Sequence, residues 1–185
     1  IGVKIEKMGS NPRWSHDDKF IIMEHQQGGG FNLAIVDIKK ETVKLLDKIG
    51  RPAIFGPNNT IIVGKHYDPY IIKMNLRTHK MDTIITGEKG TSYQELKVSP
   101  NQKYLSFFEG MMKFTSKKSL CVLNLETGKS DHIWDVGENY EFVRRQINWL
   151  SDNENIIVIL VKLNKEGKAV SGQPYKINIK TKEKK

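Results

Sequence analysis

An internal repeat constrains the fold of this chain more than any other feature. A nine-residue segment that begins with an aromatic residue or Val, passes through a turn and ends in an apolar run occurs four times. The copies begin at Trp14, Phe55, Val98 and Trp149, which are 41, 43 and 51 residues apart. A period of ~40–45 residues is typical of architectures that assemble copies of one supersecondary unit.

A second motif repeats in phase with the first. It joins a short apolar segment to a polar turn that contains Asp or Asn, and its copies are 36–40, 74–78, 123–127 and 177–181. Asp and Asn favour turns because their side chains bond to nearby backbone. The apolar runs between the turns fit strands better than helices.

Each repeat therefore predicts four short antiparallel strands, which we name A to D from the innermost outward. In the first repeat, strand A ends at Trp14, and B, C and D cover 19–26, 32–38 and 42–47. Such sheets bury their faces on one another, which favours an all-β fold, a β-propeller. We expect a single domain, 1–185, with blades at about 9–47, 50–87, 93–135 and 144–181.

The last repeat needs a strand D from elsewhere, because the four residues after Thr181 are too few. Segment 1–8 alternates apolar and polar residues without a blade of its own. We expect four blades of four antiparallel strands, closed by this N-terminal strand, with Val3 and Ile5 beside 175–179. A fragment of a larger propeller is the alternative.

The first repeat also resembles a known family. Residues 12–22 read Pro-Arg-Trp-Ser-His-Asp-Asp-Lys-Phe-Ile-Ile, which is similar to the Pro-x-Trp-Ser-Pro-Asp-Gly-Lys-x-Ile repeat of TolB-type, WD-repeat-like propellers. The resemblance covers all four repeats and is weakest in the second. It implies a bacterial scaffold of the periplasm or cell surface that binds another protein. Such propellers also occur in glycan-processing enzymes and peptidases, so the resemblance indicates fold more than activity.

Composition narrows the classes of partner. The chain has 30 Lys and Arg against 21 Asp and Glu, a net charge of +9, which favours an acidic partner. Basic and aromatic residues do not alternate as in binders of single-stranded nucleic acid. The longest apolar run, 156–161, is too short to span a membrane. Cys121 is the single cysteine, and we expect it to be a thiol of the core.

No local motif supports catalysis. The chain contains no Gly-x-Ser-x-Gly, no His-Glu-x-x-His and no Cys-x-x-Cys segment. We therefore expect a non-catalytic scaffold without a cofactor. The alternative is an enzyme or binding protein for an anionic glycan or peptide, with His25, His66 and Glu109 at the mouth, because these residues end strand B in three successive repeats. They are also the candidate metal ligands.

We place the partner-binding face on the loops between strands B and C, at 26–31, 66–70, 109–118 and 161–174. Exposed aromatic residues and Met are enriched at interface cores, and lysines at the rim speed the approach of an acidic partner. The expected contact residues are Tyr67, Tyr70, Met111, Met112, Lys113, Phe114, Lys117 and Lys118. The expected anion-binding residues, near the central mouth, are Arg51, Lys97, Arg144 and Arg145. We expect Trp14, Phe55, Val98 and Trp149 to be equivalent residues buried between blades.

Overall fold

The computed structural model describes residues 12–27, 30–46, 50, 52–64, 68–111, 118–143 and 146–185. For residues 25–27, 30, 31, 111 and 118 it describes the backbone only. In this part of the chain, we find no helix with the length and hydropathy needed to cross a bilayer.

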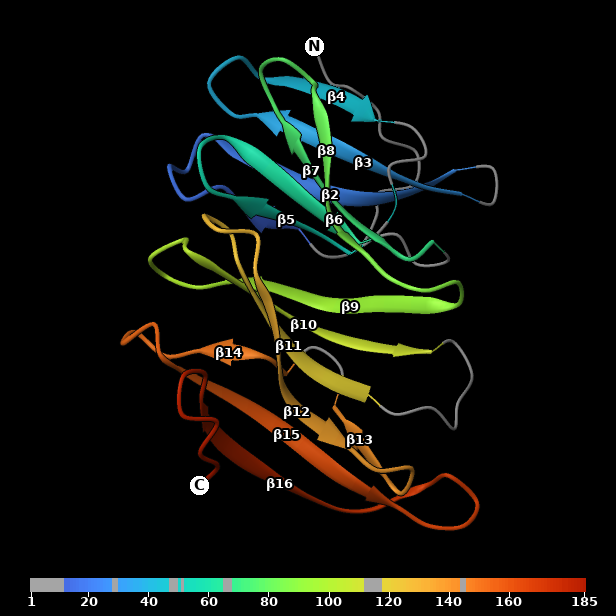
Figure 1. Cartoon of the computed structure of the whole chain (residues 1–185). Coiled ribbons are helices and arrows are strands. Elements are labelled where there is room, and N and C mark those ends of the chain that lie inside the picture. Colours follow the sequence, from blue (N-terminus) through green and yellow to red (C-terminus); the bar gives the residue numbers. More distant parts are fainter. Residues whose placement is uncertain are drawn as a thin grey trace. The chain divides into compact units, whose positions relative to one another are not determined.

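The chain forms four antiparallel sheets of four strands each, which confirms the predicted all-β architecture (Figure 1). The first two sheets follow the chain order, β1 to β4 and β5 to β8. Their strands are β1 (Arg13–Trp14), β2 (Phe20–Gln27), β3 (Gly30–Asp37), β4 (Thr42–Leu46), β5 (Ala53–Gly56), β6 (Thr60–Gly64), β7 (Tyr70–Asn75) and β8 (Met81–Thr86).

The third sheet also follows the chain order. In the fourth sheet, two short strands take the place of a single first strand. There, β13 and β14 pair with the same edge of β15, and β16 pairs with the other edge. The strands are β9 (Thr91–Val98), β10 (Tyr104–Met111), β11 (Lys118–Asn124), β12 (Ser130–Val136), β13 (Tyr140–Phe142), β14 (Asn148–Trp149), β15 (Asn155–Leu163) and β16 (Ala169–Asn178).

Contacts divide the chain into two units, each with two sheets. The first unit contains 1–66 and 70–86, and the second contains 67–69 and 87–185. In the first unit, Ile22, Leu33 and Ile35 of one sheet pack against Phe55 and other residues of the next. In the second unit, Phe108 stacks on Phe142 with ring centroids 4.6 Å apart. The prediction of one domain with the blade boundaries given above stays a prediction.

The repeat defined by sequence is a repeat of strand register. Trp14 pairs with Ile21, Phe55 with Ile61, Val98 with Leu105, and Trp149 with Ile156. The residue four positions after the first residue of each repeat lies in the turn and is in the left-handed region. These residues are Asp18, Asn59, Gln102 and Asn153, with φ of 55°, 56°, 61° and 60°. The first motif therefore encodes the A–B turn.

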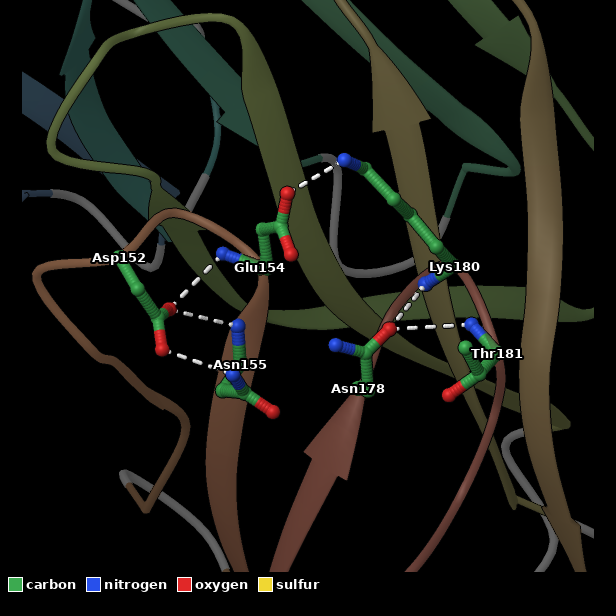
Figure 2. A network of polar contacts seen from close by, with 6 residues as sticks. All are labelled: Asp152, Glu154, Asn155, Asn178, Lys180 and Thr181. Carbon is green, nitrogen blue, oxygen red and sulfur yellow. Dashed lines mark hydrogen bonds and ion pairs between the residues drawn. The ribbon is translucent and has the colours of Figure 1, made fainter.

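The second motif encodes the C–D turn. The side-chain oxygen of Asn75, Asn124 or Asn178 accepts hydrogen bonds from the backbone N–H groups two and three residues later. The residue that follows each turn, His79, Gly128 or Lys182, is in the left-handed region. The backbone N–H of the same Asn then donates to the carbonyl of the next residue, which closes the turn. Figure 2 shows this turn at Asn178 beside the Asp152 turn, joined by an ion pair between Lys180 and Glu154.

Two local expectations are wrong. Trp14 is 58% exposed, although Phe55 is buried and Val98 and Trp149 are half-buried. Phe55 packs in the core shared with the first sheet, and the described part of the first unit holds no further sheet that could cover the equivalent face at Trp14.

The second expectation concerns the loop 161–174. This segment is mostly strand, because β15 continues to Leu163 and β16 begins at Ala169.

The outer edge of β16 has a local partner. Ile177 forms an isolated antiparallel bridge with Lys184, and Lys176 and Lys185 exchange backbone hydrogen bonds of 2.8 and 2.9 Å. The residues after Thr181, which we expected to be too few for a strand, therefore pair at this point. Segment 1–8, with Val3 and Ile5, lies outside the described residues, and its predicted closing role stays a prediction.

Trp14 and Trp149, which occupy equivalent positions in the first and last repeats, give a matched test of the packing at Trp149. Trp149 stacks on Tyr104 with centroids 6.1 Å apart, and its indole N–H donates to the carbonyl of Lys97 at 3.2 Å. We expect Trp149→Ala to lower the free energy of unfolding by about 2–4 kcal/mol. Trp14→Ala should change it by less than about 1 kcal/mol because its side chain is exposed. Denaturant unfolding measures both, and equal losses would contradict this packing.

Candidate functional site

Five of the eight residues predicted to contact a partner lie outside the described part of the chain. Tyr70 begins β7 and is 38% exposed. Met111 ends β10 and Lys118 begins β11, with only their backbone described. Tyr67, Met112, Lys113, Phe114 and Lys117 lie outside the described residues. The loop face therefore stays a prediction.

The other predicted sites are also largely outside the described part. Lys97 lies in β9, where its carbonyl accepts hydrogen bonds from Trp149 and from the Ser106 hydroxyl. His25 lies in β2 opposite Asn32, with only its backbone described. Arg51, His66, Arg144 and Arg145 lie outside the described residues. The trio of His25, His66 and Glu109 thus stays a prediction.

Glu109 has different partners within its own sheet. It lies in β10 opposite Tyr93 of β9 and Ser119 of β11. Two residues along β11, Cys121 lies opposite His132 of β12. Residues opposite one another, or two apart on a strand, share a face of the sheet. One face of the third sheet therefore collects a phenol, a carboxylate, a thiol and an imidazole.

A β-bulge in β12 adds a second carboxylate to this face. Ser119 pairs with Asp135 and Leu120 with Trp134, but Cys121 pairs with His132, so Ile133 is an extra residue. In a regular strand, residues three apart face opposite sides, and one extra residue reverses that alternation. His132 Nδ1 consequently lies 3.4 Å from Asp135 Oδ1.

The side chains form a continuous polar cluster, which we call the β10–β12 cluster: Glu109, Ser119, Cys121, His132 and Asp135. The Cys121 thiol donates to Glu109 Oε2 at 3.8 Å, and His132 Nε2 lies 3.9 Å from the same oxygen. The Ser119 hydroxyl donates to Asp135 Oδ1. One ligand atom each of Glu109, Cys121 and His132 lies within 4.8 Å of the other two, the one such group of metal-ligating side chains in the described residues.

Burial governs the ionisation of two side chains on this face of the sheet, Cys121 and Tyr93. It raises the pKa of the Cys121 thiol far above its usual range, and the charges of Glu109 and Asp135 raise it further. Burial, followed by the charge of Glu109, raises the pKa of Tyr93 to about 12. The thiol is therefore protonated at neutral pH and is not an activated nucleophile.

A pocket of about 360 Å³ lies between the two sheets of the first unit. Its apolar lining comes from strands β2, β3 and β4 of the first sheet, from β7 of the second sheet and from the turn after β7. These residues are Phe20, Ile35, Leu46, Met74 and Leu76. Its polar lining is Asp37, Lys40, Thr42, Lys44, Asn59, Arg77 and His79. We call this the turn-side pocket, because Asp37, Asn59 and 76–79 place it at the ends of the strands that carry the A–B and C–D turns.

Two polar contacts order the rim of the turn-side pocket. Lys40 pairs with Asp37 at 3.5 Å, and Lys44 Nζ lies 2.8 Å from His79 Nε2. Sequence reasoning missed the pocket because seven of its twelve lining residues belong to the repeat motifs of two separate repeats, where each residue by itself indicates only a turn or a core position. The repeated positions were the available signal.

Solved structures share the fold of this chain, whereas no family model and no curated protein matches its sequence. A TolB protein from Acinetobacter baumannii aligns with 95% of this chain and 42% of its own, at TM-score 0.63 and 15% identity. An acylaminoacyl peptidase from Pyrococcus horikoshii aligns with 99% of this chain and 32% of its own, at TM-score 0.70 and 10% identity.

An oligogalacturonate lyase from Vibrio parahaemolyticus aligns with 97% of this chain and 65% of its own, at TM-score 0.57 and 12% identity. The chain thus spans less than two thirds of the length of each of these proteins. At such identities the likeness shows the fold alone. It confirms the predicted propeller architecture and the structural resemblance to TolB-type propellers.

The protonation of Cys121 gives a direct test of the β10–β12 cluster. Because the chain has one cysteine, dithiobis(nitrobenzoate) titrates this thiol without interference. We expect the reduced, metal-free native protein to react at least about 100-fold more slowly than the urea-unfolded chain, since the thiol is buried and protonated. A native rate near the unfolded rate would contradict the burial of Cys121.

Proposed function

We propose that this β-propeller is a non-catalytic binding module that captures an acidic segment of another protein in the turn-side pocket. One observation carries the proposal: an apolar floor and a cationic rim meet in the same pocket. The net charge of +9 supports the same class of partner, because it favours the approach of an acidic surface. The structural likeness to TolB favours a bacterial periplasmic or cell-surface setting.

The size and floor of the pocket suit an apolar side chain of the partner. Its volume of about 360 Å³ lies at the lower end of the range for ligand pockets. Phe20, Leu46 and Leu76 are only partly buried and line it, so an inserted Phe or Leu would remove their remaining exposed surface from water.

The rim favours carboxylates around that side chain. Three of the lining residues, Lys40, Lys44 and Arg77, are cationic, against one carboxylate, Asp37. Asp37 pairs with Lys40, whereas Lys44 contacts His79, which carries no negative charge. An acidic residue on each side of the apolar anchor would therefore meet Lys44 and Arg77.

Two alternatives, a partner bound at the loop face and an anionic glycan as ligand, predict different results. The loop face with Tyr70 at its edge is the predicted contact surface, and it lies at the opposite ends of the strands from the turn-side pocket. An anionic glycan, the alternative substrate class, shares the charge of an acidic peptide but has no large apolar anchor. An oligogalacturonate is a suitable probe for it, since the chain has the fold of an oligogalacturonate lyase.

The test uses fluorescein-labelled ten-residue peptides and fluorescence anisotropy. The first peptide has one Phe among Asp and Glu, the second has Asn and Gln in place of the acids, and the third has Ala in place of Phe. We expect the first to bind, and the second and third to bind at least about tenfold more weakly, because each lacks one half of the recognition.

Variants locate the binding. Lys44→Glu with Arg77→Glu should weaken the acidic Phe peptide at least about tenfold, because two attractive charges become repulsive. The control pair is Lys129→Glu with Lys168→Glu, which changes the net charge by the same amount but lies in the other unit. We expect it to have a small effect on the affinity for the acidic Phe peptide. Tyr70→Ala should leave binding unchanged.

Three results would overturn the proposal. Equal weakening by both charge-reversed pairs would show that only net charge matters. Loss of binding in Tyr70→Ala with unchanged binding in the rim variant would move the contact to the loop face. Binding of the oligogalacturonate in place of the acidic Phe peptide would favour the glycan alternative.

A further inference from the structure

We propose that Glu109, Cys121 and His132 form a Zn²⁺ site on the face of the third sheet, with a fourth coordination position open to solvent. The inference does not depend on the turn-side pocket, which belongs to the other unit. It rests on the donor atoms, their spacing, the partner of the imidazole and the exposure of the cluster.

The donor set suits zinc. Thiolate sulfur, imidazole nitrogen and carboxylate oxygen are the three ligand types that bind Zn²⁺ in proteins. Zn²⁺ binding would displace the proton of the Cys121 thiol and release it to solvent. Ca²⁺ and Mg²⁺ prefer sites made entirely of oxygen ligands, so a thiol and an imidazole at the centre of the cluster disfavour both.

The spacing of the donor atoms is close to that of a four-coordinate metal. Bond lengths of about 2.0–2.3 Å place neighbouring ligand atoms roughly 3.3–3.6 Å apart in a tetrahedron. Glu109 Oε2 lies 3.8 Å from Cys121 Sγ and 3.9 Å from His132 Nε2. The donor atoms of Cys121 and His132 lie within 4.8 Å of each other. Side-chain adjustments of up to about 1 Å would therefore complete the geometry.

The backbone brings the three ligands together before any metal binds. They lie on the adjacent strands β10, β11 and β12, and Cys121 is directly opposite His132 in the register. A site built on paired strands is more rigid than one built on loops. Metal binding would then cost little conformational entropy.

The imidazole also has the partner typical of zinc ligands. Metal-bound histidines generally donate their other ring N–H to a carboxylate or carbonyl, which fixes the tautomer and the ring plane. His132 directs Nε2 toward Glu109 and Nδ1 toward Asp135, 3.4 Å away. The Ser119 hydroxyl donates to Asp135, so that carboxylate is itself oriented.

The exposure of the side chains leaves one position for water. Cys121 is fully buried, whereas the side chains of Glu109 and His132 are 30% and 54% exposed. A metal among them would be held from the sheet side by sulfur and would face solvent on the other. Lys182 Nζ donates to the backbone carbonyl of His132 at 2.8 Å, which anchors this stretch of β12.

Cobalt is the probe, because Co²⁺ replaces Zn²⁺ at such sites and absorbs light. We expect Co²⁺ added to the reduced chain of residues 1–185 to produce a thiolate-to-cobalt charge-transfer band that saturates at one equivalent. The visible bands should have the intensity of four-coordinate Co²⁺, and one equivalent of Zn²⁺ should abolish both. Zn²⁺ should also raise the melting temperature, because it binds the folded state.

Variants assign the ligands. Cys121→Ser should abolish the charge-transfer band, and His132→Gln or Glu109→Gln should weaken Co²⁺ binding at least about tenfold. Asp135→Asn, which changes a positioning residue, should weaken it about 10-fold while keeping the charge-transfer band. His16→Gln and Glu126→Gln, two matched changes outside the cluster, should bind Co²⁺ as the unmodified chain does.

The outcome is decisive in either direction. Absence of a thiolate-to-cobalt band in the unmodified chain would overturn the site, and so would unchanged affinity in His132→Gln. The His132 variant also guards against misfolding, since its side chain is exposed and its replacement should leave the fold intact, whereas Cys121 is buried. Circular dichroism and thermal unfolding check each variant.

Discussion

The register of the antiparallel strands is the constraint on which the rest of this structure depends. Side chains alternate between the two faces of a strand, so a shift of one residue would exchange every core residue for a surface residue. Here the A–B and C–D turns fix that register, with a left-handed residue at the same position of each turn. The apolar face of each sheet then packs against a second sheet within its unit.

Both functional candidates are consequences of this register. The turn-side pocket is lined by the ends of strands and by the turns that set them in two consecutive repeats. The β10–β12 cluster arises because paired strands align Glu109, Cys121 and His132, and because one bulge brings Asp135 to the same face. Neither requires a long loop, and the two lie in different units.

The sequence predicted the strands because both of its motifs are turn motifs with a physical cause. Asn75, Asn124 and Asn178 close equivalent turns through the same side-chain oxygen, and such a pattern is visible without a structure. The prediction failed for Trp14 because periodicity identifies equivalent positions but not which neighbour covers each one. That Cys121 is a buried thiol is confirmed.

The β10–β12 cluster was harder to predict than the strands, for two reasons. The sequence comparison aligned Glu109 with His25 and His66 across repeats, whereas its described partners come from the same sheet. The spacing of His132 and Asp135 also predicts opposite faces for a regular strand, and nothing in the sequence marks Ile133 as the extra residue. A chemical cluster that depends on a bulge becomes visible only with the backbone pairing.

The central claim, that register assembles these sites, is tested most directly by nuclear Overhauser effects between backbone protons of β11 and β12. The account predicts cross-strand contacts of Ser119 with Asp135, Leu120 with Trp134 and Cys121 with His132, with Ile133 lacking a partner on β11. Contacts of Cys121 with Ile133 and of Val122 with His132 would show a regular strand. That result would move His132 to the opposite face from Asp135 and contradict the account.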